Sequence, residues 1–156
     1  MGRHPRWTRR FLSDEEFGAI ARAIASAEAH TSGEIRVHLE RRVPPGPGGT
    51  PGDVLKRARD VFAHLGMHRT AERHGVLIYL AVEDRRLAIV GDEGIHGRVG
   101  EDYWASVRDL MVEKLRRQRP CDAILAAITE IVRVLREHFP RRPDDRDELS
   151  DQVSVE

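Results

Sequence analysis

Hydrophobic and polar side chains alternate along residues 34–40, and this period of two predicts a β-strand with one buried face. Residues 76–82 are almost entirely apolar, which is typical of a central strand covered on both faces. After the charged turn at 83–86, the apolar residues 87–90 predict a strand that returns beside its predecessor. The chain is therefore expected to contain a small sheet.

Apolar residues recur at helical spacing in other segments. We expect helices over approximately 14–32, 54–65, 101–117 and 121–138. Ser13 and Glu16 form a capping box at the start of the first helix, since each side chain can bond the other residue's backbone amide. Gly33 is expected to end that helix, because glycine readily adopts the left-handed conformation found at helix ends.

The elements follow the order helix, strand, helix, strand, strand, helix, helix. Because a helix joins the first two strands, they should run parallel with a right-handed crossover, whereas the third strand pairs antiparallel with the second. The predicted fold class is α/β: a small mixed sheet packed by about four helices. A basic arm (1–12) precedes this domain (13–140), and a polar, acidic tail (141–156) follows, whose composition predicts disorder.

Composition is that of an ordinary globular protein, with 40% hydrophobic and 33% charged residues. The 26 basic and 26 acidic residues cancel, so no global field attracts nucleic acid or anionic lipid, and we expect no nucleic-acid partner. No stretch has the pattern of a signal peptide, or the roughly 18 consecutive apolar residues of a transmembrane helix. We therefore expect a cytoplasmic protein without a transmembrane segment.

Short catalytic motifs are missing from the sequence. It has no Walker loop, no dinucleotide-binding glycine pattern, no nucleophile elbow and no zincin motif, which argues against nucleotide-driven and standard hydrolase chemistry. Its single cysteine, Cys121, excludes an internal disulfide and a cysteine-rich zinc site. A helix N-terminus would activate the Cys121 thiol, but no base is paired with it, and a small, partly buried side chain is the alternative.

The predicted hairpin gathers acidic residues at one end of the sheet. With a loop at 84–85, Asp92 lies opposite the start of the second strand, together with Glu93. Glu34 begins the parallel first strand, and Asp102 heads the third helix, so all four acids are expected to converge there. Such a cluster suits the hard cations Ca²⁺ and Mg²⁺. The alternative is that each is a solvated loop acid or a helix cap.

Three histidines form a second candidate cluster. His64 and His68 are four residues apart, which places both on one helix face, and His74 follows shortly after. Histidine is a common zinc ligand. However, Gly66 is expected to end the helix between them, and the alternative is a set of solvated loop histidines.

The N-terminal arm interleaves Arg3, Arg6, Arg9 and Arg10 with Trp7. Arginines beside an aromatic ring can bind phosphate groups or an anionic membrane. The alternative is a solvated, frayed terminus. The sequence leaves both interpretations open.

The pattern along the chain resembles the TPM domain family, which includes a thylakoid-lumen phosphatase and many bacterial envelope proteins. Four features in this order and spacing carry the resemblance: the TSGEI sequence at 31–35, the helix end at 62–66, HGVLI at 74–78, and the strand at 86–95 that runs into Gly-Asp-Glu-Gly. Together they cover about two-thirds of the chain.

The resemblance implies a small α/β sandwich. It also implies divalent-cation binding or acid phosphatase activity, as assigned to some members, with Asp92, Glu93 and Asp102 at the matching positions. Before the glycine of the second strand the sequence departs from the family, because Arg73 and His74 stand where members often carry an acidic residue and asparagine. The departure removes one possible oxygen ligand.

Three functional hypotheses follow. The leading one is a domain that binds Ca²⁺ or Mg²⁺ near Asp92, Glu93, Asp102 and Glu34. The second is a metal-dependent acid phosphatase acting on a phosphorylated substrate, with Asp92 as base or nucleophile and Arg73 as the phosphate-binding group. The third is a non-catalytic module, whose basic arm and acidic tail dock on a protein or membrane partner.

Overall fold

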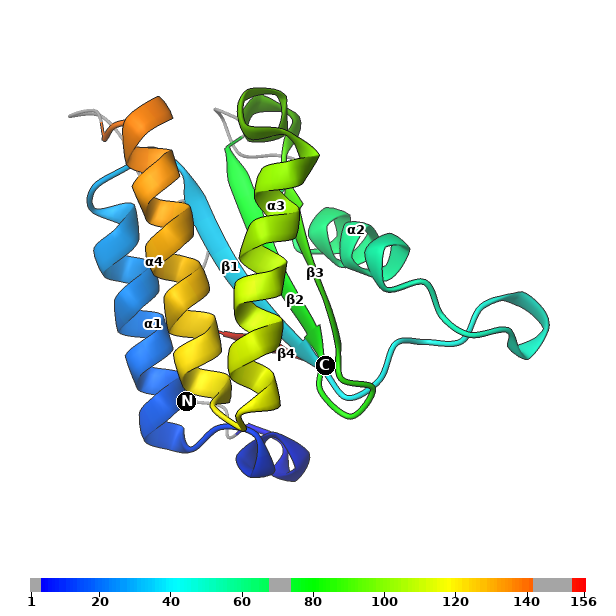
Figure 1. Cartoon of the computed structure of the whole chain (residues 1–156). Helices are drawn as coiled ribbons and strands as arrows, with labels where there is room; N and C mark the ends of the chain where they lie inside the picture. Colours follow the sequence, from blue (N-terminus) through cyan, green and yellow to red (C-terminus); the bar gives the residue numbers. More distant parts are fainter. Residues whose placement is uncertain (1–3, 68–73, 142–152) are drawn as a thin grey trace.

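The computed structural model describes residues 4–67, 74–141 and 153–156. Their strands form a mixed sheet in the order β3-β2-β1-β4 (Figure 1). The strands are β1 (Glu34–Glu40), β2 (Gly75–Ala81), β3 (Arg86–Gly91) and β4 (Ser154–Val155). The predicted parallel pairing of β1 with β2 and antiparallel pairing of β2 with β3 are both confirmed. The short β4, parallel to β1, was not predicted.

Four α-helices and two short 3₁₀-helices complete the described part. The helices are η1 (Arg6–Arg10), α1 (Asp14–Glu28), η2 (Pro47–Gly49), α2 (Val54–His64), α3 (Glu93–Arg116) and α4 (Pro120–His138). Helices α1, α4 and α3 lie side by side over one face of the sheet, and α2 covers part of the other (Figure 1). The predicted α/β class is confirmed.

The alternation along β1 decides what each face of the sheet carries. Ile35, Val37 and Leu39 are fully buried in the main core beneath α1, α3 and α4. Successive side chains of a strand point to opposite faces, so His38 and Glu40 lie on the α2 side. There α2 packs mainly on β2 and β3, through a second and smaller core. The polar face of β1 thus lies beside α2 rather than beneath it.

Helix α1 begins as predicted and ends earlier. The capping box is present, with the Ser13 hydroxyl accepting from the Glu16 amide and the Glu16 carboxylate accepting from the Ser13 amide. The helix stops at Glu28 rather than before Gly33. The reason lies at Thr31, whose hydroxyl bonds the carbonyl oxygens at the end of α4 and holds this segment against that helix.

The predicted hairpin register is wrong by two residues. Gly91, not Glu93, lies opposite Val76, because the turn is longer than the two-residue loop expected. Arg85 adopts a left-handed conformation with φ 54°. The Asp84 carboxylate accepts a 2.7 Å hydrogen bond from the amide of Val43. The segment that follows β1 therefore binds the turn and stabilises its longer form.

Helix α3 starts eight residues before the predicted position. Asp92 is its N-cap and accepts a 2.8 Å hydrogen bond from the Glu93 amide. The helix breaks at Gly100, with φ 77° and ψ 171°, so a short first part precedes the long helix that the sequence predicted. The acids at 92–93 are therefore part of a helix start, not of a loop.

Candidate metal centre

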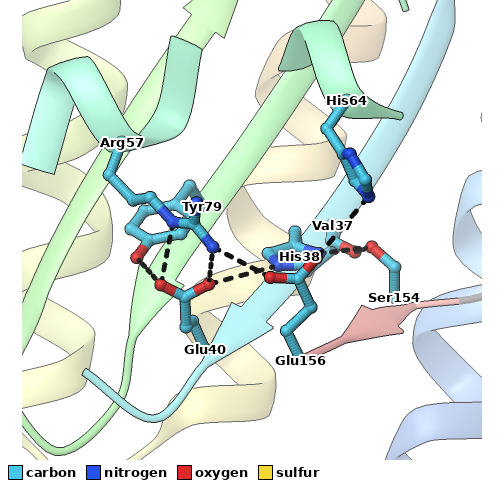
Figure 2. Close-up of polar contacts among 8 residues, drawn as sticks. All are labelled: Val37, His38, Glu40, Arg57, His64, Tyr79, Ser154 and Glu156. Carbon is cyan, nitrogen blue, oxygen red and sulfur yellow. Dashed lines mark hydrogen bonds and ion pairs between the residues drawn. The ribbon is translucent and has the colours of Figure 1, made fainter. Parts of the chain in front are cut away.

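Residues of β1 and of the C-terminal segment build a polar cluster on the open face of β1, in which His38 and Glu40 are buried and Glu156 is exposed. The strand contributes His38 and Glu40 from alternate positions. Beside it, β4 pairs in parallel, and the amide of Glu156 donates to the carbonyl oxygen of Leu39 at 3.1 Å. The side chains of His38, Glu40 and Glu156 consequently point toward one another (Figure 2).

His38 contacts β4 through its Nδ1 atom. The Ser154 hydroxyl has a single proton, which it donates to the Val37 carbonyl oxygen at 3.3 Å. With that proton on the Val37 carbonyl oxygen, the 2.7 Å contact between Ser154 and His38 Nδ1 requires the tautomer in which the ring nitrogen is the donor. Nε2 then carries a lone pair. It is buried, has no hydrogen-bond partner among the described residues, and lies 3.8 Å from an oxygen of Glu40.

The carboxylates of this cluster are oriented by α2. Arg57 donates to both oxygens of Glu40, at 3.0 and 2.6 Å, and to Glu156 at 2.8 Å. The hydroxyl of Tyr79 donates to Glu40 at 3.0 Å. His64, at the end of α2, places Nε2 4.0 Å from the other oxygen of Glu156 (Figure 2). Two carboxylates therefore face one guanidinium, which leaves excess negative charge near His38.

Electrostatics keep His38 neutral and Glu40 ionised. Burial lowers the pKa of His38, and its effect exceeds the opposing attraction of Glu156 and Glu40. Burial alone would raise the pKa of Glu40, but the hydrogen bonds from Arg57 and Tyr79 lower it overall. A neutral imidazole and an ionised carboxylate are the protonation states that metal ligands need.

The ligand atoms are close enough to share one cation. One possible ligand atom from each of His38, Glu40 and Glu156 lies within 4.8 Å of the other two. Among the described residues, this is the group of at least three histidine, cysteine, aspartate or glutamate side chains that meets this distance. The donor set, one imidazole nitrogen and carboxylate oxygens, is typical of zinc and related divalent metals. The Nδ1–H bond to Ser154 is the kind of outer contact that fixes a metal-binding histidine.

The structure places two of the four acids predicted to converge beside the same residue of β2. Glu34 and Asp92 both adjoin Gly75, since Glu34 pairs with it across β1 and β2 and the Asp92 amide donates to its carbonyl oxygen at 2.8 Å. Both acids are buried, at 5% and 6% exposure. Glu93 and Asp102 are exposed on α3. The metal-binding role of these residues stays a prediction.

The other candidate residues from the sequence are Arg73, the three histidines and Cys121. Arg73 and His68 lie outside the described residues. The rings of His74 and Phe139 are in tilted contact, with centroids 3.6 Å apart, and His64 lies beside Glu156 of the candidate cluster. Cys121 sits in the first turn of α4, where burial raises the pKa of its thiol, so this cysteine is not activated.

Sequence reasoning missed His38, Glu40 and Glu156 as a group. The alternation of β1 does place His38 and Glu40 on the polar face, and that signal was available. No local signal brings Glu156 to them, because it lies more than 100 residues away in a stretch whose composition predicts disorder. Contacts over such a separation depend on the tertiary fold.

Comparison with known proteins identifies the family. The TPM domain family matches residues 8–134. An NMR structure of the BA42 protein from the psychrophilic bacterium Bizionia argentinensis is similar with a TM-score of 0.83 and 40% identity, covering 94% of this chain and 96% of that one. Among curated proteins, no sequence matches this chain.

Two more distant structures share the fold alone. The N-terminal domain of a P. gingivalis protein has a TM-score of 0.57 at 20% identity, covering 85% of this chain and 83% of that one. The N-terminal domain of the cg2496 protein from Corynebacterium glutamicum has a TM-score of 0.58 at 14% identity, covering 86% of each. Of the helices described, none is long and apolar enough to cross a membrane. The family match and the BA42 similarity confirm the resemblance seen in the sequence: the chain belongs to the TPM domain family.

Proposed function

We propose that this TPM domain binds a divalent transition metal, of which Zn²⁺ is the representative, through His38, Glu40 and Glu156. One observation carries the proposal: the buried Nε2 of His38 has no hydrogen-bond partner among the described residues and faces carboxylate oxygen. A buried polar atom without a partner costs free energy, and two facing lone pairs repel. A cation between them removes both penalties.

The identity of the donors favours Zn²⁺ over Ca²⁺ or Mg²⁺ at this cluster. Calcium and magnesium prefer sets made only of oxygen, whereas imidazole suits zinc, copper and nickel. Arg57 need not leave, because each carboxylate oxygen has two lone pairs and can accept from Arg57 while binding a metal. In this arrangement Arg57 positions the two carboxylates and limits their repulsion before the metal binds.

Thermal unfolding with and without metal tests the proposal. After treatment with EDTA, the wild type should be stabilised by Zn²⁺, and a ligand at about 100 times its Kd contributes about 2.7 kcal/mol, or several degrees in Tm. Glu156→Gln should abolish most of the shift without unfolding the protein, since this side chain is 42% exposed. Glu113→Gln, which alters another exposed carboxylate paired with arginine, is the matched control.

An unchanged Zn²⁺ shift in both Glu156→Gln and His38→Gln would place zinc elsewhere and end the proposal. A shift that is lost in Glu113→Gln as well would indicate nonspecific binding to surface carboxylates.

A second cation site, for Ca²⁺ or Mg²⁺, is proposed at Asp92 with Glu34. The buried Oδ2 of Asp92 has no hydrogen-bond partner within the described ranges, and the backbones of both acids adjoin Gly75. The same thermal unfolding measurements distinguish this site from the site at His38, Glu40 and Glu156. A Ca²⁺ shift that disappears in Asp92→Asn and persists in Glu156→Gln would support this site, and no Ca²⁺ or Mg²⁺ shift would exclude it.

Phosphatase activity remains a proposal that depends on a metal. A bound metal would polarise a phosphoryl oxygen or activate water, and Asp92 and Arg73 are the predicted partners. Turnover of p-nitrophenyl phosphate that requires metal and is lost in Asp92→Ala would support it. Activity that survives both the removal of metal and Asp92→Ala would come from another site or from a contaminant. Metal binding without turnover would fit the hypothesis of a non-catalytic module.

A further inference from the structure

A basic pocket lies at the end of the sheet where the parallel strands β1 and β2 finish. Its volume is about 580 Å³, within the usual range for small-ligand sites. The lining includes Arg6, Trp7, Arg10 and Phe11 from the N-terminal segment, and Arg41 and Glu83 from the ends of the strands. In open α/β sheets, ligands bind in the crevice outside the carboxyl ends of the strands, which is the position of this pocket.

The N-terminal arm forms this pocket because it is folded against the domain. Thr8 is fully buried in η1, and the amides of Phe11 and Leu12 both donate to its carbonyl oxygen. The packing half-buries Trp7 and Phe11 against the main core. The intervening arginines remain exposed, and η1 lies at the same end of the molecule as the β2–β3 turn (Figure 1).

The far side of the pocket is fixed by the strand ends. The amide of Glu83 donates to the carbonyl oxygen of Arg41 at 2.9 Å, which continues the β1–β2 pairing beyond the strands. The Glu83 carboxylate accepts from Arg41 at 2.8 Å and from Arg42 at 3.0 Å. The single acid of the lining is therefore engaged by two guanidinium groups.

The pocket consequently carries positive charge that nothing in the described chain neutralises. Arg6 and Arg10 have no ion-pair partner among the residues that the structure describes. Guanidinium groups bind phosphate through paired, charge-assisted hydrogen bonds. Aromatic side chains between arginines provide a surface on which a planar ring can stack.

We propose that this pocket binds a small phosphorylated ligand that carries an aromatic ring, as nucleotides do. The phosphate contacts Arg6, Arg10 and Arg41, and the ring packs against Trp7 and Phe11. This binding is independent of the metal centre, which lies on the α2 face of the sheet. The proposal gives a role to the arginines and the tryptophan of the N-terminal arm, which take no part in the proposed metal sites.

Calorimetric titration with AMP tests the proposal on the full chain, with adenosine and inorganic phosphate as partial ligands. AMP should bind, and each part alone should bind more weakly. Replacing both arginines (Arg6→Ala with Arg10→Ala) should weaken AMP binding by about tenfold or more, because charge-assisted hydrogen bonds are lost. Arg9→Ala is the matched control, since Arg9 is exposed on the same short helix and does not line the pocket.

Tryptophan fluorescence locates the ring independently. The chain has two tryptophans, and Trp104 is buried in the core. In a Trp104→Phe variant, AMP should quench the remaining emission from Trp7, and Trp7→Phe should remove the response while phosphate still binds.

Three results would overturn the proposal: no AMP binding at millimolar concentration, AMP binding unchanged in the double arginine variant, or equal affinity for inorganic phosphate. Binding to vesicles that contain phosphatidic acid, without binding to AMP, would also overturn it and assign the arginines to a membrane surface.

Discussion

Glu40 shows how a single buried charge can be retained on the face of a sheet. It is 6% exposed, and its carboxylate is satisfied by Arg57 from α2 and by Tyr79 from β2. Hydrogen bonds to charged groups contribute more than neutral ones, and an isolated carboxylate at this depth would be strongly unfavourable. The same contacts hold the pKa of Glu40 below its usual range despite burial.

The pKa shift of Glu40 sets the pH range of its contribution to stability. Because the folded-state pKa is lowered, the stabilisation is present above the unfolded-state value of about 4.3 and is lost as pH falls through the folded-state pKa. We expect Glu40→Gln to reduce the free energy of unfolding by about 1–3 kcal/mol near neutral pH. The difference from wild type should shrink in acid, as measured by urea unfolding across the pH range.

The control for this prediction is an exposed pair of the same type. Glu130 and Arg133 bond on the surface of α4, and exposed pairs are worth less than about 1 kcal/mol. Glu130→Gln should therefore change stability little at any pH. A loss in Glu40→Gln that persists unchanged in acid would mean that packing, and not charge, is responsible.

At the scale of elements, local chemistry predicted most of the fold. The Ser13–Glu16 capping box and the alternation of β1 depend only on neighbouring residues, and both are confirmed. The hairpin register failed because Asp84 bonds the backbone at Val43, a contact that no local pattern reveals. The start of α3 differs from the prediction because Asp92 serves as its N-cap, so Glu93 lies in the helix and not in the predicted loop.

Two glycines of α3 give a prediction at this scale. Gly100 has φ 77° and ψ 171°, a region that only glycine occupies without strain, whereas an added Cβ at Gly97 meets no atom within 4 Å. Gly100→Ala should lower the free energy of unfolding by about 1–3 kcal/mol. Gly97→Ala, in the exposed first part of the helix, should raise it by about 0.5–1 kcal/mol.

Denaturant unfolding of both variants provides the comparison, because the substitution is the same and only the backbone conformation differs. If both alanines stabilised the protein, the break at Gly100 would not exist in solution, and α3 would be one continuous helix.

At the scale of the whole molecule, the fold brings the last residues of the sequence beside its first strand. Ser154 bonds a histidine that is 116 positions away, and Val153 enters the main core. The candidate metal centre is thus complete only after β4 has paired with β1. This dependence on long-range pairing explains why the centre could not be predicted from the sequence, although two of its three candidate ligands lie in the predicted strand β1.

The dependence on β4 leads to a prediction about a residue that touches no metal. When its own proton lies on the Val37 carbonyl oxygen, Ser154 accepts the Nδ1–H of His38 and favours the tautomer that exposes the Nε2 lone pair. Outer contacts of this kind change metal affinity by about 10–100-fold. We expect Ser154→Ala to weaken Zn²⁺ binding by about that factor, measured by competition with a chelating dye, while the backbone pairing of β4 remains.

The control is Ser106→Ala, which removes an exposed hydroxyl on α3 that is bonded to the Tyr103 carbonyl oxygen. It should leave the affinity for Zn²⁺ unchanged. Zinc affinity equal to wild type in Ser154→Ala would show that β4 supplies Glu156 alone, and that His38 reaches its metal-binding tautomer without help from the other end of the chain.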